Sequence, residues 1–331
     1  MKHNRVAWSL FSLASLMLII SCDDDSSSEV KDVSRYEWQK SALSPNGLFF
    51  SALLKVGDDG RLYAFGTSGN SGAQSIFQYA DNIGSDTKWV FVSKPQTDAY
   101  YNLQNLAIFQ GSIYYHGYNK LYKQENGSVL EVLSANVLRS IKVYNGKLII
   151  NGEGINISNN KFTVVSYDGT TFSPLSDVIQ PINMMPANDK LYFPGWPAFV
   201  YDGQDLRPLD YSGYIYAVDV EESIYFGEAI FSDFTRQMSG FTMEKKLLNG
   251  EISTVGNTVH KFGFPNRVQF YDGTLVMTGR ENGNGPSTTF YLDDEKWIQI
   301  PTEHMIFDVI VYNDKLLSIS LDGNIFELVK K

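Results

Sequence analysis

Residues 144–152 read YNGKLIING, a tight Asn-Gly turn followed by an apolar strand that ends in glycine. Asn-Gly pairs favour two-residue hairpin turns because both residues tolerate positive φ. Six further segments show the same order of turn, apolar run and, in most of them, final glycine: DDGRLYAFG (58–66), FQGSIYYHG (109–117), ANDKLYFPG (187–195), EESIYFG (221–227), YDGTLVMTG (271–279) and YNDKLLSIS (312–320). This recurrence indicates that one small β unit is repeated along the chain.

The spacing of these segments gives the size of the unit. The equivalent apolar positions are Leu62, Ile113, Leu148, Leu191, Ile224, Leu275 and Leu316, at intervals that average about 42 residues. That is the length of a four-stranded propeller blade. Short alternating apolar runs are separated by Gly, Asn and Asp, and stretches with a helical period are almost absent. The sequence therefore predicts an all-β fold, a seven-bladed β-propeller of four-stranded blades.

The last unit, residues 305–329, contains only three predicted strands. The missing strand is predicted near the other end of the chain, where YEWQK (36–40) resembles the Trp-bearing outer strands KWVFV (88–92) and KWIQI (296–300). We expect residues 36–42 to pair beside residues 324–329. Such pairing closes the ring and removes the exposed edges of an open sheet.

The repeat resembles a degenerate kelch repeat of kelch and galactose-oxidase-like propellers. A glycine ends the second strand, a Tyr-Asp pair such as Tyr167-Asp168 follows the third, and Trp297 illustrates the last. The double glycine of kelch is replaced by single glycines. The resemblance implies ligand sites on the face where the innermost strands begin. It does not extend to galactose-oxidase catalysis, which needs a tyrosine crosslinked to a cysteine, because Cys22 is the only cysteine of the chain.

The first residues predict export and lipidation. Lys2 and Arg5 precede the apolar run 6–20, and the sequence IISC (19–22) resembles the lipobox of bacterial lipoproteins. We therefore expect residues 1–21 to be a lipoprotein signal peptide and Cys22 to carry the lipid. An ordinary signal peptide whose cysteine lies near the cleavage site by chance is the alternative. With a single cysteine, no disulfide is expected in the exported protein.

Residues 22–34 are expected to form an acidic, serine-rich tether, and residues 35–331 the kelch-like propeller. The run DDD (23–25) resembles the export signal of surface lipoproteins in Bacteroidetes-type bacteria. This resemblance implies an outer-membrane lipoprotein exposed at the cell surface, with a periplasm-facing lipoprotein as the second expectation. The membrane is thus an expected partner, through the lipid on Cys22.

Composition narrows the other partners. The chain is 43% hydrophobic, enough for a large core, and its 27 Lys and Arg against 37 Asp and Glu give a net charge of −10. A negative protein repels polyphosphates, which excludes nucleic acid as the main partner. A glycan or an envelope protein is expected instead.

The long loops that follow the second strands predict a binding face. Aromatic rings stack on the apolar faces of sugars, while Arg, Asn and Asp side chains hydrogen-bond their hydroxyl groups. The ligand-binding candidates on this face are Tyr101, His116, Arg139, Trp196, Tyr214, Arg236, His260, Arg267, Arg280 and His304.

No catalytic motif, metal site or cofactor site is predicted, because the histidines come from different units without paired spacing. The preferred interpretation is a non-catalytic glycan- or protein-binding module. The alternative is a carbohydrate-active enzyme, a hydrolase, lyase or epimerase, and a third interpretation is an assembly subunit without a small ligand. Carboxylates that can converge across the channel in the enzyme are those of Asp98, Glu153, Glu228 and Glu303.

Overall fold

The computed structural model describes residues 34–43, 50–68, 74–80, 88–92, 106–117, 119–125, 128–177, 179, 183–231, 238–281, 287–304, 306–320 and 323–331. The chain divides into two units, Met1–Val33 and Ser34–Lys331, and every described residue belongs to the second. The expected signal peptide, Cys22 and residues 22–33 of the expected tether lie outside the described residues. Within the described ranges, no helix is long and apolar enough to cross a membrane.

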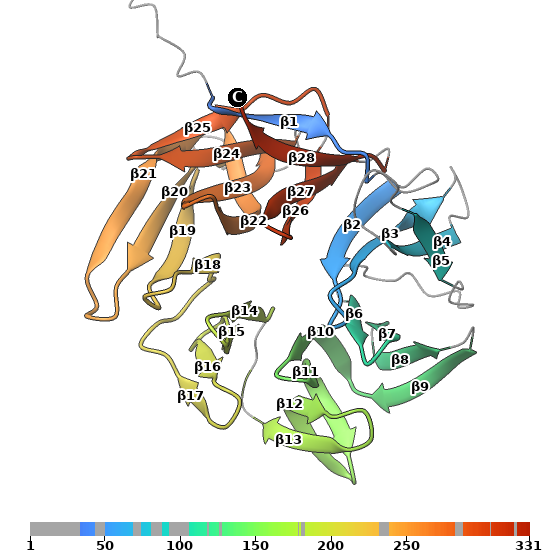
Figure 1. Ribbon diagram of the computed structural model, residues 1–331. Helices are drawn as coiled ribbons and strands as arrows, with labels where there is room; N and C mark the ends of the chain where they lie inside the picture. The colour runs from blue at the N-terminus through green and yellow to red at the C-terminus, as the bar shows by residue number, and fades with distance from the viewer. Residues whose placement is uncertain are drawn as a thin grey trace, which may run out of the picture. The chain divides into compact units, whose positions relative to one another are not determined.

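Seven four-stranded antiparallel sheets follow one another as the blades of a β-propeller (Figure 1). The first strands of the blades are β2 (Phe50–Val56), β6 (Leu106–Phe109), β10 (Val137–Tyr144), β14 (Met185–Ala187), β18 (Ala217–Val218), β22 (Phe262–Tyr271) and β26 (Ile306–Tyr312). The second strands are β3 (Leu62–Ser68), β7 (Ser112–His116), β11 (Lys147–Ile157), β15 (Lys190–Phe193), β19 (Ile224–Phe231), β23 (Thr274–Glu281) and β27 (Lys315–Ser320).

The third strands are β4 (Gln74–Ala80), β8 (Lys120–Glu125), β12 (Asn160–Tyr167), β16 (Phe199–Tyr201), β20 (Met238–Lys246), β24 (Ser287–Asp293) and β28 (Ile325–Lys330). The fourth strands are β5 (Trp89–Val92), β9 (Ser128–Ser134), β13 (Phe172–Ser176), β17 (Leu206–Pro208), β21 (Ile252–His260), β25 (Lys296–Ile300) and β1 (Tyr36–Lys40). The predicted all-β fold of seven four-stranded blades is confirmed.

The repeated hairpin forms the centre of each blade. Asn145 and Gly146 have φ of 48° and 65°, as the Asn-Gly turn between β10 and β11 requires. The equivalent Leu or Ile of every second strand is at most 8% exposed. These residues are Leu62, Ile113, Leu148, Leu191, Ile224, Leu275 and Leu316. The repeat detected in the sequence is therefore a core-packing repeat.

Among the described residues, the core consists of seven apolar clusters, each made by the facing sides of two neighbouring blades. Phe109 of the second blade packs in one cluster with Leu148 of the third. Leu317 of the last blade shares another with Leu54 of the first. Apolar burial contributes about 25 cal/mol per Å2. Because the apolar clusters lie between neighbouring blades, these interfaces are the main source of stability.

The N-terminal strand completes the last blade. β1 pairs antiparallel with β28, from Tyr36 opposite Lys330 to Lys40 opposite Phe326. The predicted closure of residues 36–42 against residues 324–329 is thus observed, with the strand ending at Lys40. Tyr36 is 1% exposed, and its hydroxyl donates a hydrogen bond to Asp272 Oδ2 at 2.6 Å. Its ring meets that of Tyr291 edge-on, with the centroids 4.8 Å apart.

We expect Tyr36→Ala to lower the free energy of unfolding by about 3 to 5 kcal/mol, since it empties an aromatic site between two blades. Tyr36→Phe keeps the ring and loses one hydrogen bond, a change of about 1 kcal/mol. Urea unfolding measures both, with exposed Gln39→Ala on the same strand as the control. A change below about 0.5 kcal/mol for Tyr36→Ala contradicts this role of the closing strand.

Candidate functional site

A cavity of about 600 Å3 lies along the inside of the ring and is lined by residues of, or just before, the first strand of every blade. This volume is in the range of small-molecule sites. The charged side chains among its lining residues are Lys55 on β2, Lys142 on β10 and Arg267 on β22. No Asp or Glu is among the lining residues whose side chains the structure describes; the side chain of Asp308, on the inner strand β26, is not among those described. All three of these basic residues also have interaction partners of their own in the structure.

The strand register places these cations. Lys55 is opposite Tyr63, and Lys142 is opposite Ile149; each partner directly follows the repeated leucine of its blade. The two lysines therefore occupy the same position of the repeat. In β22 that position is Gln269, opposite Val276. A register shift between Pro265 and Arg267 lies directly before the arginine. Bulges of this kind commonly change the direction of a side chain.

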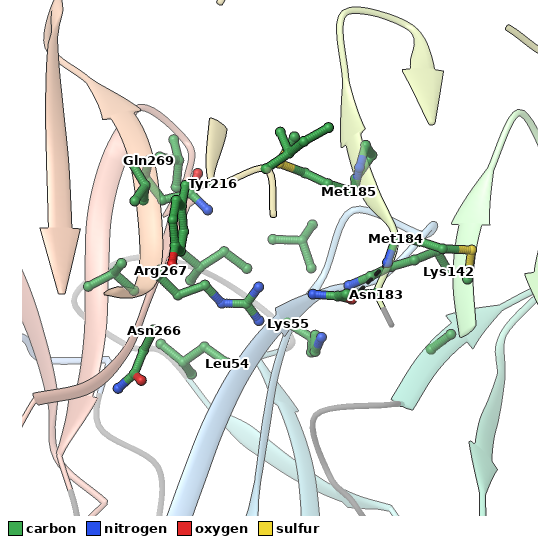
Figure 2. A pocket seen from close by; sticks show the side chains of 18 of the residues that line it. Leu54, Lys55, Lys142, Asn183, Met184, Met185, Tyr216, Asn266, Arg267 and Gln269 are labelled. Carbon is green, nitrogen blue, oxygen red and sulfur yellow. Dashed lines mark hydrogen bonds between the residues drawn. The ribbon is translucent and has the colours of Figure 1, made fainter. Parts of the chain in front are cut away.

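Amide and phenol groups complete the polar lining. Figure 2 shows the labelled side chains of Lys55, Asn183 and Arg267 directed toward the middle of the cavity. Asn183 Oδ1 accepts a hydrogen bond from the backbone N–H of Met184 at 2.8 Å. Burial raises the pKa of Tyr216, and its hydroxyl, like that of an ordinary tyrosine, is protonated at neutral pH.

An exposed aromatic pair adjoins the cavity. Trp196 is 66% exposed and Tyr214 49% exposed, and their rings meet edge-on with the centroids 5.4 Å apart. Tyr214 also lines the cavity. The pair joins the loop after β15 to the segment before β18.

Backbone hydrogen bonds position this pair. Gly195 and Gly213 exchange two of them, at 3.0 and 2.8 Å, and Ala198 N donates to Tyr211 O at 3.1 Å. Gly213 has φ of 142°, and a Cβ there would lie 2.7 Å from the Tyr211 hydroxyl. A glycine is thus required at this point, and the Tyr211 hydroxyl itself donates to Tyr214 O at 2.9 Å. These hydrogen bonds join the two segments that carry Trp196 and Tyr214.

The structure brings three of the ten candidates together: Tyr214 and Arg267 line the cavity, and Trp196 contacts Tyr214. Two others, Tyr101 and Arg236, lie outside the described residues.

The remaining candidates lie on separate blades. His116 is 5% exposed at the end of β7, where its Nδ1 lies 2.8 Å from the carbonyl oxygen of Gly117. Arg139 is exposed on β10 and pairs with Glu153, Nη2 to Oε1 2.6 Å. His260 is exposed at the end of β21, and Arg280 is half-buried on β23. His304 is exposed, with its ring centroid 4.4 Å from that of Phe326.

The carboxylates considered for catalysis do not line the cavity where they are described. Glu153 is held by Arg139, and Glu228 and Glu303 are exposed; Asp98 lies outside the described residues. Among the residues that the structure describes, no three His, Cys, Asp or Glu side chains are grouped so as to hold a metal ion.

Sequence reasoning missed Lys55, Lys142, Asn183, Tyr216 and Gln269 as lining residues. Their signal was present in the repeat: Lys142 and Gln269 each stand six residues before the repeated leucine, and Lys55 stands seven before it. Comparing that one position across all units would have drawn attention to the inner strands, which face the channel of any propeller.

Known structures share this fold. A selenomethionine-substituted virginiamycin B lyase from Staphylococcus aureus is 14% identical over 89% of this chain and 100% of that chain, with a TM-score of 0.52. A catalytically inactive virginiamycin B lyase from the same organism, with quinupristin, is 12% identical over 89% and 99%, with a TM-score of 0.51. BamB from Moraxella catarrhalis is 11% identical over 85% and 98%, with a TM-score of 0.40.

Identities this low show the fold alone. No protein-family model matches the sequence, and no curated protein matches it. The class of protein that the comparisons define is thus the β-propeller.

His116 provides a test of which candidates are structural. Burial lowers its pKa, against the opposing effect of the Gly117 and Arg139 backbone, so the folded state favours the neutral ring. The stability that this provides is present above about pH 6.5 and is lost as the pH falls below it, since the unfolded chain binds the proton more tightly. We expect the free energy of unfolding to fall between pH 7 and 5, and to fall less in His116→Asn.

Urea unfolding at several pH values measures this slope, with exposed His304→Asn as the matched control. An equal slope in His116→Asn and in the unsubstituted protein contradicts the buried, neutral state of His116.

Proposed function

We propose that this propeller is a non-catalytic binding module that takes a glycan at the rim of its central cavity. The observation that carries the proposal is the exposed Trp196–Tyr214 pair beside a cavity of about 600 Å3. Sugars present apolar C–H faces that stack on aromatic rings, and amphipathic rings of this kind combine apolar contact with a polar edge. A well-formed cavity next to such rings supplies the hydrogen-bonding groups that recognise hydroxyls.

The rigidity of the rim supports binding. The loops that carry Trp196 and Tyr214 are joined by the hydrogen bonds between Gly195 and Gly213. The Leu209 N–H adds a further hydrogen bond, to Ala198 O at 2.8 Å. A platform that is already ordered loses less conformational entropy when a ligand binds, so more of the contact energy appears as affinity.

The second candidate function is a carbohydrate-active enzyme. The observation that favours it is the cavity itself, which is large enough to enclose a reacting sugar. Glycosidases commonly need two carboxyl groups about 5 to 10 Å apart. The described lining offers lysine, arginine, amide and phenol groups instead, which supports recognition more than hydrolysis.

The proposal also includes the location. A kelch-like propeller tethered by residues 22–34 to a lipid on Cys22 would display the Trp196 rim at the outer membrane, toward the medium if the acidic run 23–25 directs surface export. The support for this step is the sequence alone: the lipobox, the single cysteine and the acidic run. An envelope protein is then the alternative ligand.

We expect Trp196→Ala and Tyr214→Ala each to weaken glycan binding at least tenfold, because aromatic side chains at the centre of a binding surface often contribute more than about 1.4 kcal/mol. The free energy of unfolding should change by less than about 1 kcal/mol, since both rings are exposed. A glycan array followed by calorimetry on the full chain with Cys22→Ala measures the binding.

Leu248→Ala is the matched control, because Leu248 is also apolar and 75% exposed but lies in the turn between β20 and β21. A glycan that binds the Trp196→Ala protein as tightly as the parent contradicts the proposed site. Mass spectrometry of the recovered sugar tests the enzyme: a chemically changed product supports the second candidate.

For the anchor, we expect Cys22→Ala to abolish incorporation of labelled palmitate and to release the protein from the membrane fraction, because its thiol carries the proposed lipid. Ser21→Ala, which keeps a small residue before the cysteine, is the control. Unchanged labelling of the Cys22→Ala protein contradicts lipidation at this residue, and protease treatment of intact cells distinguishes the surface from the periplasmic location.

A further inference from the structure

The two exposed rings at the rim of the cavity stand at nearly a right angle to each other. The planes of the Trp196 and Tyr214 rings make an angle of 88°, and their centroids are 5.4 Å apart. Rings at this separation and angle are in direct edge-to-face contact. A sugar ring therefore cannot enter between them and be clamped from both sides. A ligand can reach only the exposed faces of the two rings, and these faces form a corner.

Tyr211 holds both sides of this corner. Its carbonyl oxygen accepts the hydrogen bond of Ala198 N at 3.1 Å, two residues after Trp196. Its hydroxyl donates to Tyr214 O at 2.9 Å. Its ring contacts that of Phe226, with the centroids 5.3 Å apart, and both pack against the apolar cluster between the fourth and fifth blades. The angle between the two exposed rings is thus set from the core.

The corner continues into the cavity on one side. Tyr214 is among the residues that line the cavity of about 600 Å3, whereas Trp196 is not among them. Both rings are exposed. A ligand that contacts both rings must therefore turn at the rim, from the outer surface beside Trp196 to the mouth of the cavity beside Tyr214.

The right angle distinguishes glycans by the shape of their chains. A sugar ring stacks with its apolar face parallel to the aromatic plane. In a β-1,4-linked glucan or mannan, successive sugar rings are nearly parallel and the chain is a flat ribbon, so it can stack on only one of two perpendicular planes. In an α-linked chain such as an α-1,4-glucan, successive rings are inclined and the chain curves. Neighbouring units of a curved chain can therefore lie against both planes.

We infer that the rim binds a curved glycan, with one sugar unit against Trp196 and a neighbouring unit against Tyr214 at the mouth of the cavity. Tyr211 is the positioning residue for this selectivity, because it holds the segments of both rings. A flat ribbon makes one of the two ring contacts and loses the other. This inference rests on the proposed glycan-binding function and specifies its ligand class.

The first experiment compares chains of one sugar that differ only in linkage. Calorimetry on the full chain with Cys22→Ala compares maltohexaose with cellohexaose, and an α-1,2-linked mannotetraose with its β-1,4-linked isomer. We expect the curved member of at least one pair to bind about tenfold more tightly, because the flat member loses one stacked ring. Trp196→Ala and Tyr214→Ala should each remove this preference.

The second experiment changes the corner and keeps both rings. In Gly213→Ala the new Cβ would lie 2.7 Å from the Tyr211 hydroxyl, which is then displaced from Tyr214 O. We expect the ratio of curved to flat affinity to fall about threefold or more, the effect of one lost hydrogen bond. Gly250→Ala is the matched control, because Gly250 also has a positive φ, 89°, but no atom lies within 4 Å of the added Cβ.

A variant with a smaller change protects this test against misfolding. Tyr211→Phe removes only the hydroxyl and keeps the ring that packs on Phe226. It should lower the same ratio while Gly250→Ala leaves it unchanged. An unchanged ratio in both Gly213→Ala and Tyr211→Phe overturns the positioning role of Tyr211.

The outcomes separate this inference from the proposed function. Equal or tighter binding of the flat chains overturns the curved ligand but leaves glycan binding at the rim. If the glycan array identifies a different sugar, curved and flat chains of that sugar decide in the same way. Binding of no probe here and of no glycan on the array overturns both proposals.

Discussion

The packing of each blade against the next is the interaction on which the rest of this structure depends. A four-stranded sheet has two faces, and the seven apolar clusters show that each face is covered by a neighbouring blade. The ring must therefore close, because an uncovered terminal blade would expose an apolar face to water. Pairing of β1 with β28 gives the last blade its fourth strand and joins the two ends of the propeller unit.

Closure also creates the site. With every blade packed side by side, the inner strands together line one cavity, and small differences among these strands decide its shape. The inner strands of the fourth and fifth blades are the shortest, β14 with three residues and β18 with two. In these two blades the loop after β15 carries Trp196 and the segment before β18 carries Tyr214. The hydrogen bonds between Gly195 and Gly213 join these two segments.

Most of the fold was predictable from the sequence because the repeat is local: a hairpin turn, an apolar strand and a final glycine recur at nearly even spacing. The site was predictable only in part. Trp196, Tyr214 and Arg267 were among the candidates, but His116, on the same predicted face, is buried beside its own backbone. One inner strand carries side chains that face the cavity and side chains that face the next blade. The alternation of apolar and polar residues along that strand does not tell these two kinds of side chain apart.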